Sequence, residues 1–195
     1  MGFSRAQLEA ARTATVPDLV GPHPRLLFVG INPGLWTAAA QAHFARRGNR
    51  FYPALYRAGI LDRVVDASAG YRPGDVEHLI ERGVAITNVV ARATARADEL
   101  DRDELIAGGR ILEGRVRDLA PRVVAILGVT AYRAAFALPR ALAGRQPGDL
   151  GGAQLWVAPN PSGLNAHASL DALAAAYREV AVAAGISVYP RPGYP

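Results

Sequence analysis

Short runs of apolar residues recur along the chain and end in turns rich in glycine or proline. Runs of this kind predict strands that are buried on both faces of a parallel sheet. Between two of them, the apolar residues of Asp103–Leu119 recur at intervals close to 3.6, which predicts an amphipathic helix. The four predicted strands are Leu26–Val29, Val84–Val90, Val123–Leu127 and Gln154–Ala158.

Helical segments separate these strands, and this alternation predicts an α/β fold. We expect a three-layer α/β/α sandwich with a central, mostly parallel sheet of four to five strands. The segment Pro139–Gly152 is rich in proline and glycine and is predicted to be irregular. Right-handed crossovers place the loops that follow the strands along one edge of the sheet, where a site is expected. A further helix is predicted to open with Phe51–Tyr56 and to end at Gly59, and the others are Asp75–Arg82, Thr130–Phe136 and Leu170–Ala184. Ala38–Arg46 is either a helix or an ordered loop.

The length of the chain, 195 residues, predicts one domain over residues 1–195 with a substantial core. Residues 1–24 are expected to form an N-terminal helix and linker, and residues 189–195 a proline-rich tail. No apolar stretch approaches the roughly 20 residues of a membrane-spanning helix. The N-terminal residues also lack the apolar core of a signal peptide. We therefore expect a monomeric cytoplasmic protein that does not bind membranes, associated with the nucleoid if it is bacterial.

The composition excludes several kinds of chemistry. The chain has no cysteine, which rules out disulfides, a cysteine nucleophile, thiolate zinc sites and iron–sulfur clusters. The histidines are scattered, and a phosphate-binding loop and a nucleophile elbow are both missing. We therefore expect no metal and no cofactor. The net charge of +5 favours a polyanionic partner such as nucleic acid.

Two loops after predicted strands carry the polar groups of the expected site. Gly30-Ile31-Asn32-Pro33-Gly34 follows the first strand, and Asn160-Pro161-Ser162-Gly163-Leu164 follows the last. Glycine and proline permit a sharp turn with the backbone close to a ligand. Asn32 is the one polar side chain of the first turn, and it either faces a ligand, caps the next helix or closes its own turn.

Five motifs in order resemble the mismatch-specific uracil-DNA glycosylase and thymine-DNA glycosylase family, within the uracil-DNA glycosylase superfamily. The resemblance runs from about Arg25 to Val180. The motifs are Gly30–Gly34, Gly48–Phe51, Ala107–Arg110, Ala125–Gly128 and Asn160–Leu164.

The resemblance implies a hydrolase of base excision repair that acts on double-stranded DNA. Such an enzyme flips uracil out of the stack, often opposite guanine, and breaks its glycosidic bond with water. Asn32 matches the catalytic asparagine of the family, whose side-chain carbonyl positions the water. An amide is not a base at neutral pH, so catalysis rests on this positioning and on backbone N–H groups that stabilise the leaving base.

A carboxylate near the same edge would add a general base, and Asp98 is the candidate. Family members often carry an amide or another polar residue there. The alternative is that Asp98 caps the helix that begins near Asp101 or Asp103, or is simply solvated.

The resemblance also implies a pocket for the flipped base. Phe44 falls where the family stacks an aromatic ring on that base, and the alternative is a core phenylalanine. Trp36 is either a wall of the pocket or ordinary packing. The expected pocket residues are Gly30, Ile31, Gly34, Trp36, Thr37, Phe44 and Asn160.

The last loop matches the family's wedge, which fills the gap that the flipped base leaves. Relatives carry a basic residue just after the leucine, whereas this chain does not, so Asn165 or His167 is expected to contact the orphaned base. The alternative is that Asn165 or Ser169 caps the last helix. The expected wedge and contact residues are Ser162, Gly163, Leu164, Asn165 and His167.

Arginines near these loops are expected to contact DNA phosphates. Arg92 and Arg96 are further candidates, although an arginine-rich surface can also be merely solvated. Asn49 and Arg50 could instead brace their own loop. The expected backbone contacts are Arg46, Arg47, Asn49 and Arg50.

Two other functions fit the same residues. One is a glycosylase tuned to hypoxanthine, xanthine or ethenocytosine, because recognition through backbone groups makes a permissive pocket. The other is a catalytically weak protein that binds lesions without removing them.

Overall fold

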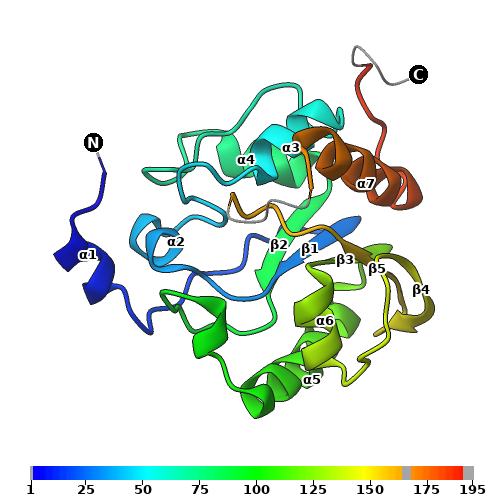
Figure 1. The fold of residues 1–195 in the computed structure, drawn as a ribbon. Coiled ribbons are helices and arrows are strands. Elements are labelled where there is room, and N and C mark those ends of the chain that lie inside the picture. Colours follow the sequence, from blue (N-terminus) through cyan, green and yellow to red (C-terminus); the bar gives the residue numbers. More distant parts are fainter. Residues whose placement is uncertain (1, 164–167, 191–195) are drawn as a thin grey trace.

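A five-stranded sheet forms the centre of the computed structural model, which describes residues 2–163 and 168–190 (Figure 1). The strand order is β2-β1-β3-β5-β4. Neighbouring strands are parallel except for β4, which runs antiparallel to β5 at one edge. The strands are β1 (Leu26–Gly30), β2 (Val84–Asn88), β3 (Val123–Leu127), β4 (Gly144–Leu150) and β5 (Ala153–Ala158).

Helices cover both faces of this sheet, as expected for the α/β/α sandwich. The helices α3, α4 and α7 pack on one face, and α5 and α6 pack on the other (Figure 1). The helices are α1 (Arg5–Ala10), α2 (Leu35–Ala40), α3 (Phe51–Arg57), α4 (Asp75–Glu81), α5 (Arg102–Leu119), α6 (Val129–Ala135) and α7 (Leu170–Ala183), with a short 3₁₀ helix η1 (Ala97–Glu99) before α5.

Alternate residues of each central strand point into two separate cores. In β1, Leu26 and Phe28 pack with α3 and α7, whereas Leu27 and Val29 pack with α5 and α6. All four are fully buried, which explains why β1 reads as a continuous apolar run and shows no polar alternation.

Side-chain caps fix where the helices next to the site begin. Asp101 accepts a hydrogen bond from the Glu104 backbone N–H at 2.7 Å and caps α5. Ser169 accepts one from the Ala172 N–H at 3.1 Å and caps α7, as one of the sequence alternatives proposed. Asp98 therefore does not cap α5.

Three elements differ from the sequence prediction. The segment predicted to be irregular contains β4, an edge strand whose pairing with β5 is interrupted between Arg145 and Asp149. The strand predicted over Val84–Val90 ends at Asn88, where its partner β1 also ends. Tyr189, predicted to begin a free tail, donates its N–H to Gly59 O at 2.7 Å, and the Arg82 guanidinium lies over its ring. These two contacts hold the end of the described chain against α3 and α4.

Within residues 2–163 and 168–190, the helices are too short or too polar to span a membrane.

Candidate active site

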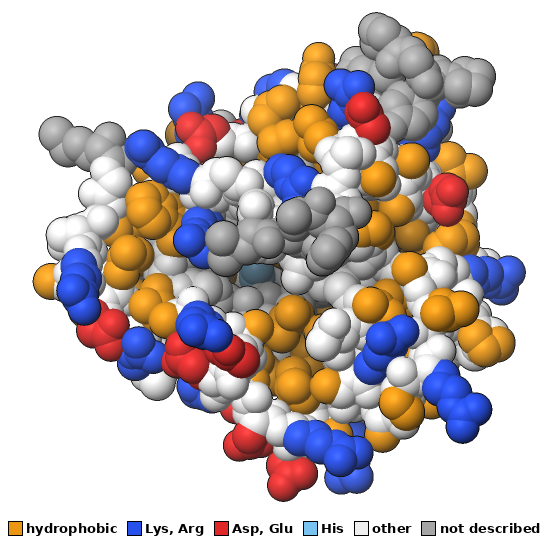
Figure 2. All heavy atoms as spheres, in the orientation of Figure 1, with side chains coloured by type: hydrophobic (Ala, Val, Ile, Leu, Met, Phe, Trp, Pro, Cys, Tyr) orange, Lys and Arg blue, Asp and Glu red, His pale blue; other side chains and the backbone are white. Residues whose placement is uncertain are grey.

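A cavity of about 450 Å³ opens at the carboxyl ends of the parallel strands. Figure 2 shows a hollow near the centre of this side of the molecule, with arginine side chains around it. This is the edge at which open α/β sheets bind ligands. The lining residues are Gly30, Ile31, Asn32, Gly34, Thr37, His43, Phe44, Arg46, Asn49, Asn88, Thr94, Ala95, Arg96, Ala97, Asp98, Leu127, Asn160 and Ser162.

The amide of Asn32 is held in one orientation. Its Nδ2 donates to Arg92 O at 2.9 Å, to Pro33 O at 3.2 Å and to Thr94 Oγ1 at 2.8 Å. Backbone carbonyls only accept hydrogen bonds, so the nitrogen must face them. The carbonyl oxygen Oδ1 of Asn32 forms no hydrogen bond to any residue that the structure describes, and it is left available to the cavity.

The groups that hold Asn32 are themselves anchored. Arg92 forms a two-pronged ion pair with Glu104 of α5, at 2.9 and 2.8 Å, and this fixes the segment that presents Arg92 O. Thr94 Oγ1 donates onward to Arg96 O at 2.7 Å, so its lone pairs are free to accept from Asn32. Asn32 is thus preorganised by a network that reaches α5.

Asp98 lies on the same cavity wall, in η1. Its two carboxylate oxygens accept from Nε of Arg96, at 3.0 Å, and from Nη2 of the same guanidinium. This pairing raises the pKa of Arg96 and leaves the carboxylate with further lone pairs. The side chain of Asp98 is 63% exposed. A water molecule entering the cavity can therefore reach it.

A second amide, Asn88, lies at the end of β2 beside Gly30 of β1. It is 8% exposed, and its Nδ2 faces Nδ1 of the buried His43 at 3.4 Å. A Cβ on residue 30 would lie 2.6 Å from Asn88 Oδ1 and 3.5 Å from the ring of Phe44. Glycine at position 30 therefore leaves room for the Asn88 carbonyl group.

His43 sets the orientation of Asn88. Its Nε2 lies 2.9 Å from Pro17 O, which can only accept, so Nε2 carries the hydrogen and Nδ1 of the neutral ring accepts from Asn88. Burial lowers the pKa of His43 below its ordinary value of 6.5, against the opposing effects of the Pro17 hydrogen bond and the Asp18 charge. The hydroxyls of Tyr52 and Tyr71 contact its backbone at 3.0 and 3.1 Å.

The lowered pKa of His43 predicts a loss of stability in acid. Between the folded-state pKa and about 6.5, the unfolded chain binds a proton at this position that the folded chain does not. The free energy of unfolding should therefore fall as the pH drops below about 6.5, and His43 should contribute no pH dependence above it. Thermal unfolding from pH 7.5 to 5 measures this, with His43→Gln as the variant that stays neutral. Equal declines in both proteins would contradict the prediction.

Phe44 belongs to both the core and the cavity. Its ring stacks on Phe51 with centroids 4.0 Å apart, and Phe51 packs on Phe28 and Tyr177. Its backbone has φ of +54°, a conformation that bulky residues rarely adopt and that persists when the surroundings enforce it. The stacking on Phe51 holds the Phe44 ring at the cavity.

Several predicted site residues lie elsewhere. Trp36 does not line the cavity, because its Nε1 donates to Ser68 O at 2.9 Å and its ring packs edge-on against Phe3. Arg50 donates to Ser162 O at 3.0 Å and to Ala168 O, on either side of the undescribed residues 164–167. Its guanidinium therefore braces the loop after β5, and the expected contact with a DNA phosphate stays a prediction.

Asn49 also acts within the chain, since its Oδ1 accepts from the Phe51 N–H at 2.9 Å at the start of α3. Arg46 and Arg47 are exposed, and both line a groove of about 240 Å³ that continues to Ser162 and Gly163. Leu164, Asn165 and His167, predicted for the wedge and the orphaned base, lie outside the described residues.

Asn88, His43 and Thr94 are the polar cavity residues that the sequence analysis did not predict. Asn88 was predicted to lie inside a strand. It could have been recognised as a candidate because it is a polar residue within an otherwise mainly apolar run. Thr94 and His43 gave no such signal, because each acts by holding the side-chain amide of a residue far away in sequence. Thr94 holds Asn32, and His43 holds Asn88. Among residues 2–163 and 168–190, no three histidine, aspartate or glutamate side chains are grouped so that they could hold a metal ion.

Comparison with known proteins gives two findings. A sequence model of the uracil DNA glycosylase superfamily matches residues 17–181. The fold is similar to the solution NMR structure of a candidate uracil DNA glycosylase from Methanosarcina acetivorans, with a TM-score of 0.58 and 15% identity over 86% of this chain and 98% of that one. At this identity, the structural match shows a shared fold. The sequence match includes every residue that lines the cavity.

Proposed function

Because the chain belongs to the uracil-DNA glycosylase superfamily, we propose that it excises uracil from double-stranded DNA by hydrolysis of the glycosidic bond, with U·G mismatches among its substrates. The base would first be flipped out of the stack into the cavity of about 450 Å³, at an unstacking cost that is smallest at a mismatch. The residues described above suit this reaction in three ways.

The anchoring of Asn32 is the observation that carries the proposal. Three acceptors hold its Nδ2, so its carbonyl oxygen is presented to the cavity and can accept a hydrogen bond from a water molecule. A water held in this way is already oriented for attack on the sugar carbon, and such positioning avoids much of the entropic cost of the step.

Asp98 supplies the base that an amide cannot. It shares the cavity wall with Asn32, and Arg96 fixes its carboxylate through two contacts. In the proposed reaction, the water donates one proton to Asp98 as its oxygen bonds to the sugar carbon. The electrons of the glycosidic bond leave with the base, whose negative charge is stabilised by backbone N–H groups of the turn after β1.

Asn88 gives a reason for selecting uracil over cytosine. His43 holds Nδ2 of Asn88, so the carbonyl oxygen of Asn88 is turned toward Gly30 at the cavity floor. An acceptor there pairs with the N3–H of uracil but meets only a lone pair at N3 of cytosine, and an unpaired buried polar group is costly. Hypoxanthine and xanthine also carry a ring N–H, so the same argument admits them as secondary substrates.

The amino-acid composition favours a reaction that stops at the abasic site. All 22 basic side chains are arginine, and the sequence contains no lysine. Enzymes that go on to cut the DNA strand commonly form an imine with a side-chain amine, which a guanidinium does not provide. We therefore propose a monofunctional glycosylase. Arg46 and Arg47 are its candidate phosphate contacts, because they are exposed along the groove beside the cavity.

Single-turnover excision tests the proposal on duplexes with U·G, U·A, T·G, hypoxanthine·T and normal C·G pairs, and on single-stranded uracil. The expected result is an alkali-labile abasic site from U·G, none from C·G, and no adduct after borohydride reduction. Retardation of the uracil duplex in a gel without any abasic site would instead identify a lesion-binding protein. A borohydride-trapped adduct would contradict the monofunctional reaction.

A further inference from the structure

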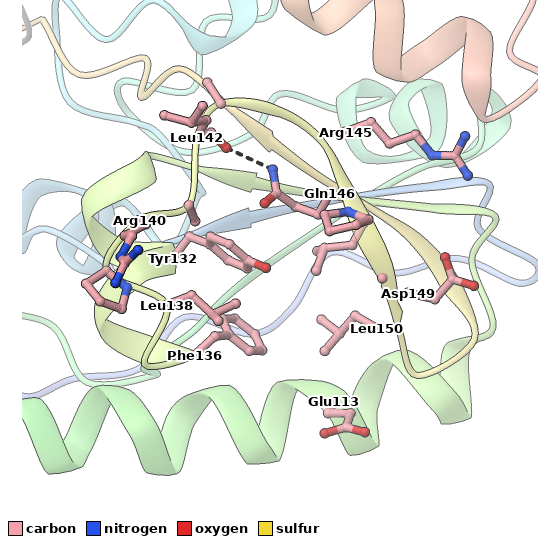
Figure 3. Close-up of a pocket in the computed structure, with 16 residues that line it drawn as sticks. Glu113, Tyr132, Phe136, Leu138, Arg140, Leu142, Arg145, Gln146, Asp149 and Leu150 are labelled. Atoms are coloured by element: carbon pink, nitrogen blue, oxygen red, sulfur yellow. Dashed lines mark hydrogen bonds between the residues drawn. The ribbon is translucent and has the colours of Figure 1, made fainter.

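A second cavity, of about 950 Å³, lies on the face of the sheet that α5 and α6 cover (Figure 3). It is open to solvent and is lined by residues of α5, α6, the segment 137–143 and the hairpin of β4 and β5. It has no lining residue in common with the candidate active site and is about twice as large. The proposed reaction leaves it without a role.

The walls of this cavity are mainly apolar and partly aromatic. Tyr132 and Phe136 lie on one side with their rings 5.0 Å apart, and Leu150 and Leu155 of the hairpin lie on the other. Leu142 is 72% exposed at the margin. Cavities of this size and character are typical of sites for small organic ligands.

Two hydrogen bonds make the cavity wall a fixed structure. Arg133 Nε donates to Ala141 O at 2.9 Å, and Gln146 Nε2 donates to Leu142 O at 2.8 Å. They tie the segment 137–143 to α6 on one side and to β4 on the other. The cavity therefore does not depend on a ligand to hold this segment in place.

Gln146 turns one unsatisfied acceptor toward the cavity. Its side chain is buried, with 9% exposed, and both amide hydrogens are engaged by the backbone oxygens of Leu142 and Gly144, at 2.8 and 2.9 Å. The oxygen Oε1 has no hydrogen-bond donor among the residues that the structure describes, and Figure 3 shows the amide directed into the cavity. The oxygen is not among the fully buried unpartnered atoms of the described residues, so it is open to the cavity and can accept from a ligand that enters it.

Tyr132 provides the complementary group. The residue is 3% exposed, and its hydroxyl has no partner among residues 2–163 and 168–190. Burial raises the pKa of this phenol, so the hydroxyl stays protonated at neutral pH and can donate. Figure 3 shows the hydroxyl pointing into the same cavity as the amide of Gln146. The site thus offers this acceptor and this donor on walls that are mainly apolar, and the charged side chains of Glu113, Arg140, Arg145 and Asp149 also line it.

From these groups, we propose that the cavity binds a small planar heterocycle with a ring N–H next to a carbonyl, the chemical class that includes free uracil, thymine and hypoxanthine. The ring N–H donates to Gln146 Oε1, the carbonyl accepts from the Tyr132 hydroxyl, and the ring lies against Phe136. The proposal does not depend on excision, since it concerns residues separate from the active site.

The test is a titration of the ¹⁵N-labelled chain, followed by NMR, with 2-pyridone, the smallest aromatic ring of this class. Shifts should concentrate in residues 132–150. N-methyl-2-pyridone, which lacks the donor, should bind about tenfold more weakly, as expected for one lost hydrogen bond. Titrations with uracil and with its nucleoside monophosphate distinguish a free base from a nucleotide as the better ligand.

Two variants assign the interaction to the cavity. Tyr132→Phe keeps the ring and should weaken 2-pyridone binding about tenfold, whereas Asn32→Ala in the active site should leave it unchanged. Equal binding of the two pyridones would overturn the proposal, and so would shifts confined to the active site. Absence of any shift at 10 mM ligand would overturn it as well, because this concentration is about 10 times a dissociation constant of about 1 mM, which we take as the weakest specific binding.

Discussion

Asn32→Ala is expected to slow the excision of uracil by about 10²–10³-fold without reducing stability to a comparable extent. The size follows from what is lost: a preorganised polar group at the reacting centre is commonly worth about that factor. Alanine removes the carbonyl that we propose positions the water, and it also frees Arg92 O and Pro33 O. Single-turnover excision of a U·G duplex measures the rate, and thermal unfolding checks the fold.

Thr94→Val is the matched control for this experiment. Valine keeps the shape of the side chain but removes one of the three acceptors of Asn32 Nδ2, at 2.8 Å. The two backbone carbonyls still orient the amide, so the loss of rate should be clearly smaller, within about tenfold. Equal losses in both variants would mean that Asn32 acts only as a structural link between segments, and an unchanged rate in Asn32→Ala would remove it from the reaction.

Asp98→Asn should slow excision by about 10²–10⁴-fold, the range that a general base contributes. The amide has almost the same size and can still accept a hydrogen bond from Arg96, but it takes no proton from water. The measurement is again single-turnover excision, now with single-stranded and U·A substrates included. A true base should matter in every context, because the step it serves is common to all of them.

Arg96→Ala distinguishes the role of Asp98 as a base from the effect of its ion pair with Arg96. Both variants lose the ion pair between Arg96 and Asp98, but only Asp98→Asn loses the carboxylate. Because both side chains are mostly exposed, the pair itself contributes little to stability. Arg96→Ala should therefore keep most of the activity. If the two variants lose activity equally, Asp98 serves only to hold its neighbours, and Asn32 is left as the sole positioned group.

Much of the fold could be predicted because its strongest signals are local. The buried runs of β1 and β3 and the periodic apolar face of α5 each mark one element, and parallel pairing then follows from their alternation. The edge strand β4 escaped because Gly144–Leu150 contains glycine and proline and is mostly exposed. Its pairing with β5 is a contact between segments, and no periodicity within β4 reports it.

The site could be predicted only in part, for the same physical reason. Asn32 and Asp98 lie in the segments that follow β1 and β2, whose position at the sheet edge follows from the order of the strands, and both line the cavity. The partner of Arg50 could not be read from the sequence, because Ser162 O and Ala168 O come within reach only after α3 and α7 pack together. The orientation of Asn88 likewise depends on His43, which lies 45 residues away.

The internal use of arginine has a consequence for DNA binding in salt. The guanidinium groups of Arg50, Arg92 and Arg96 contact backbone carbonyls or carboxylates of the chain itself, so we expect them to add little to the release of condensed cations from a DNA duplex. Each phosphate that is neutralised adds about 0.9 to the slope of log affinity against log salt concentration. The affinity should therefore fall with salt only as steeply as the few outward-facing arginines dictate. The slope measured in a salt titration should therefore correspond to far fewer phosphate contacts than the number of arginines near the cavity suggests.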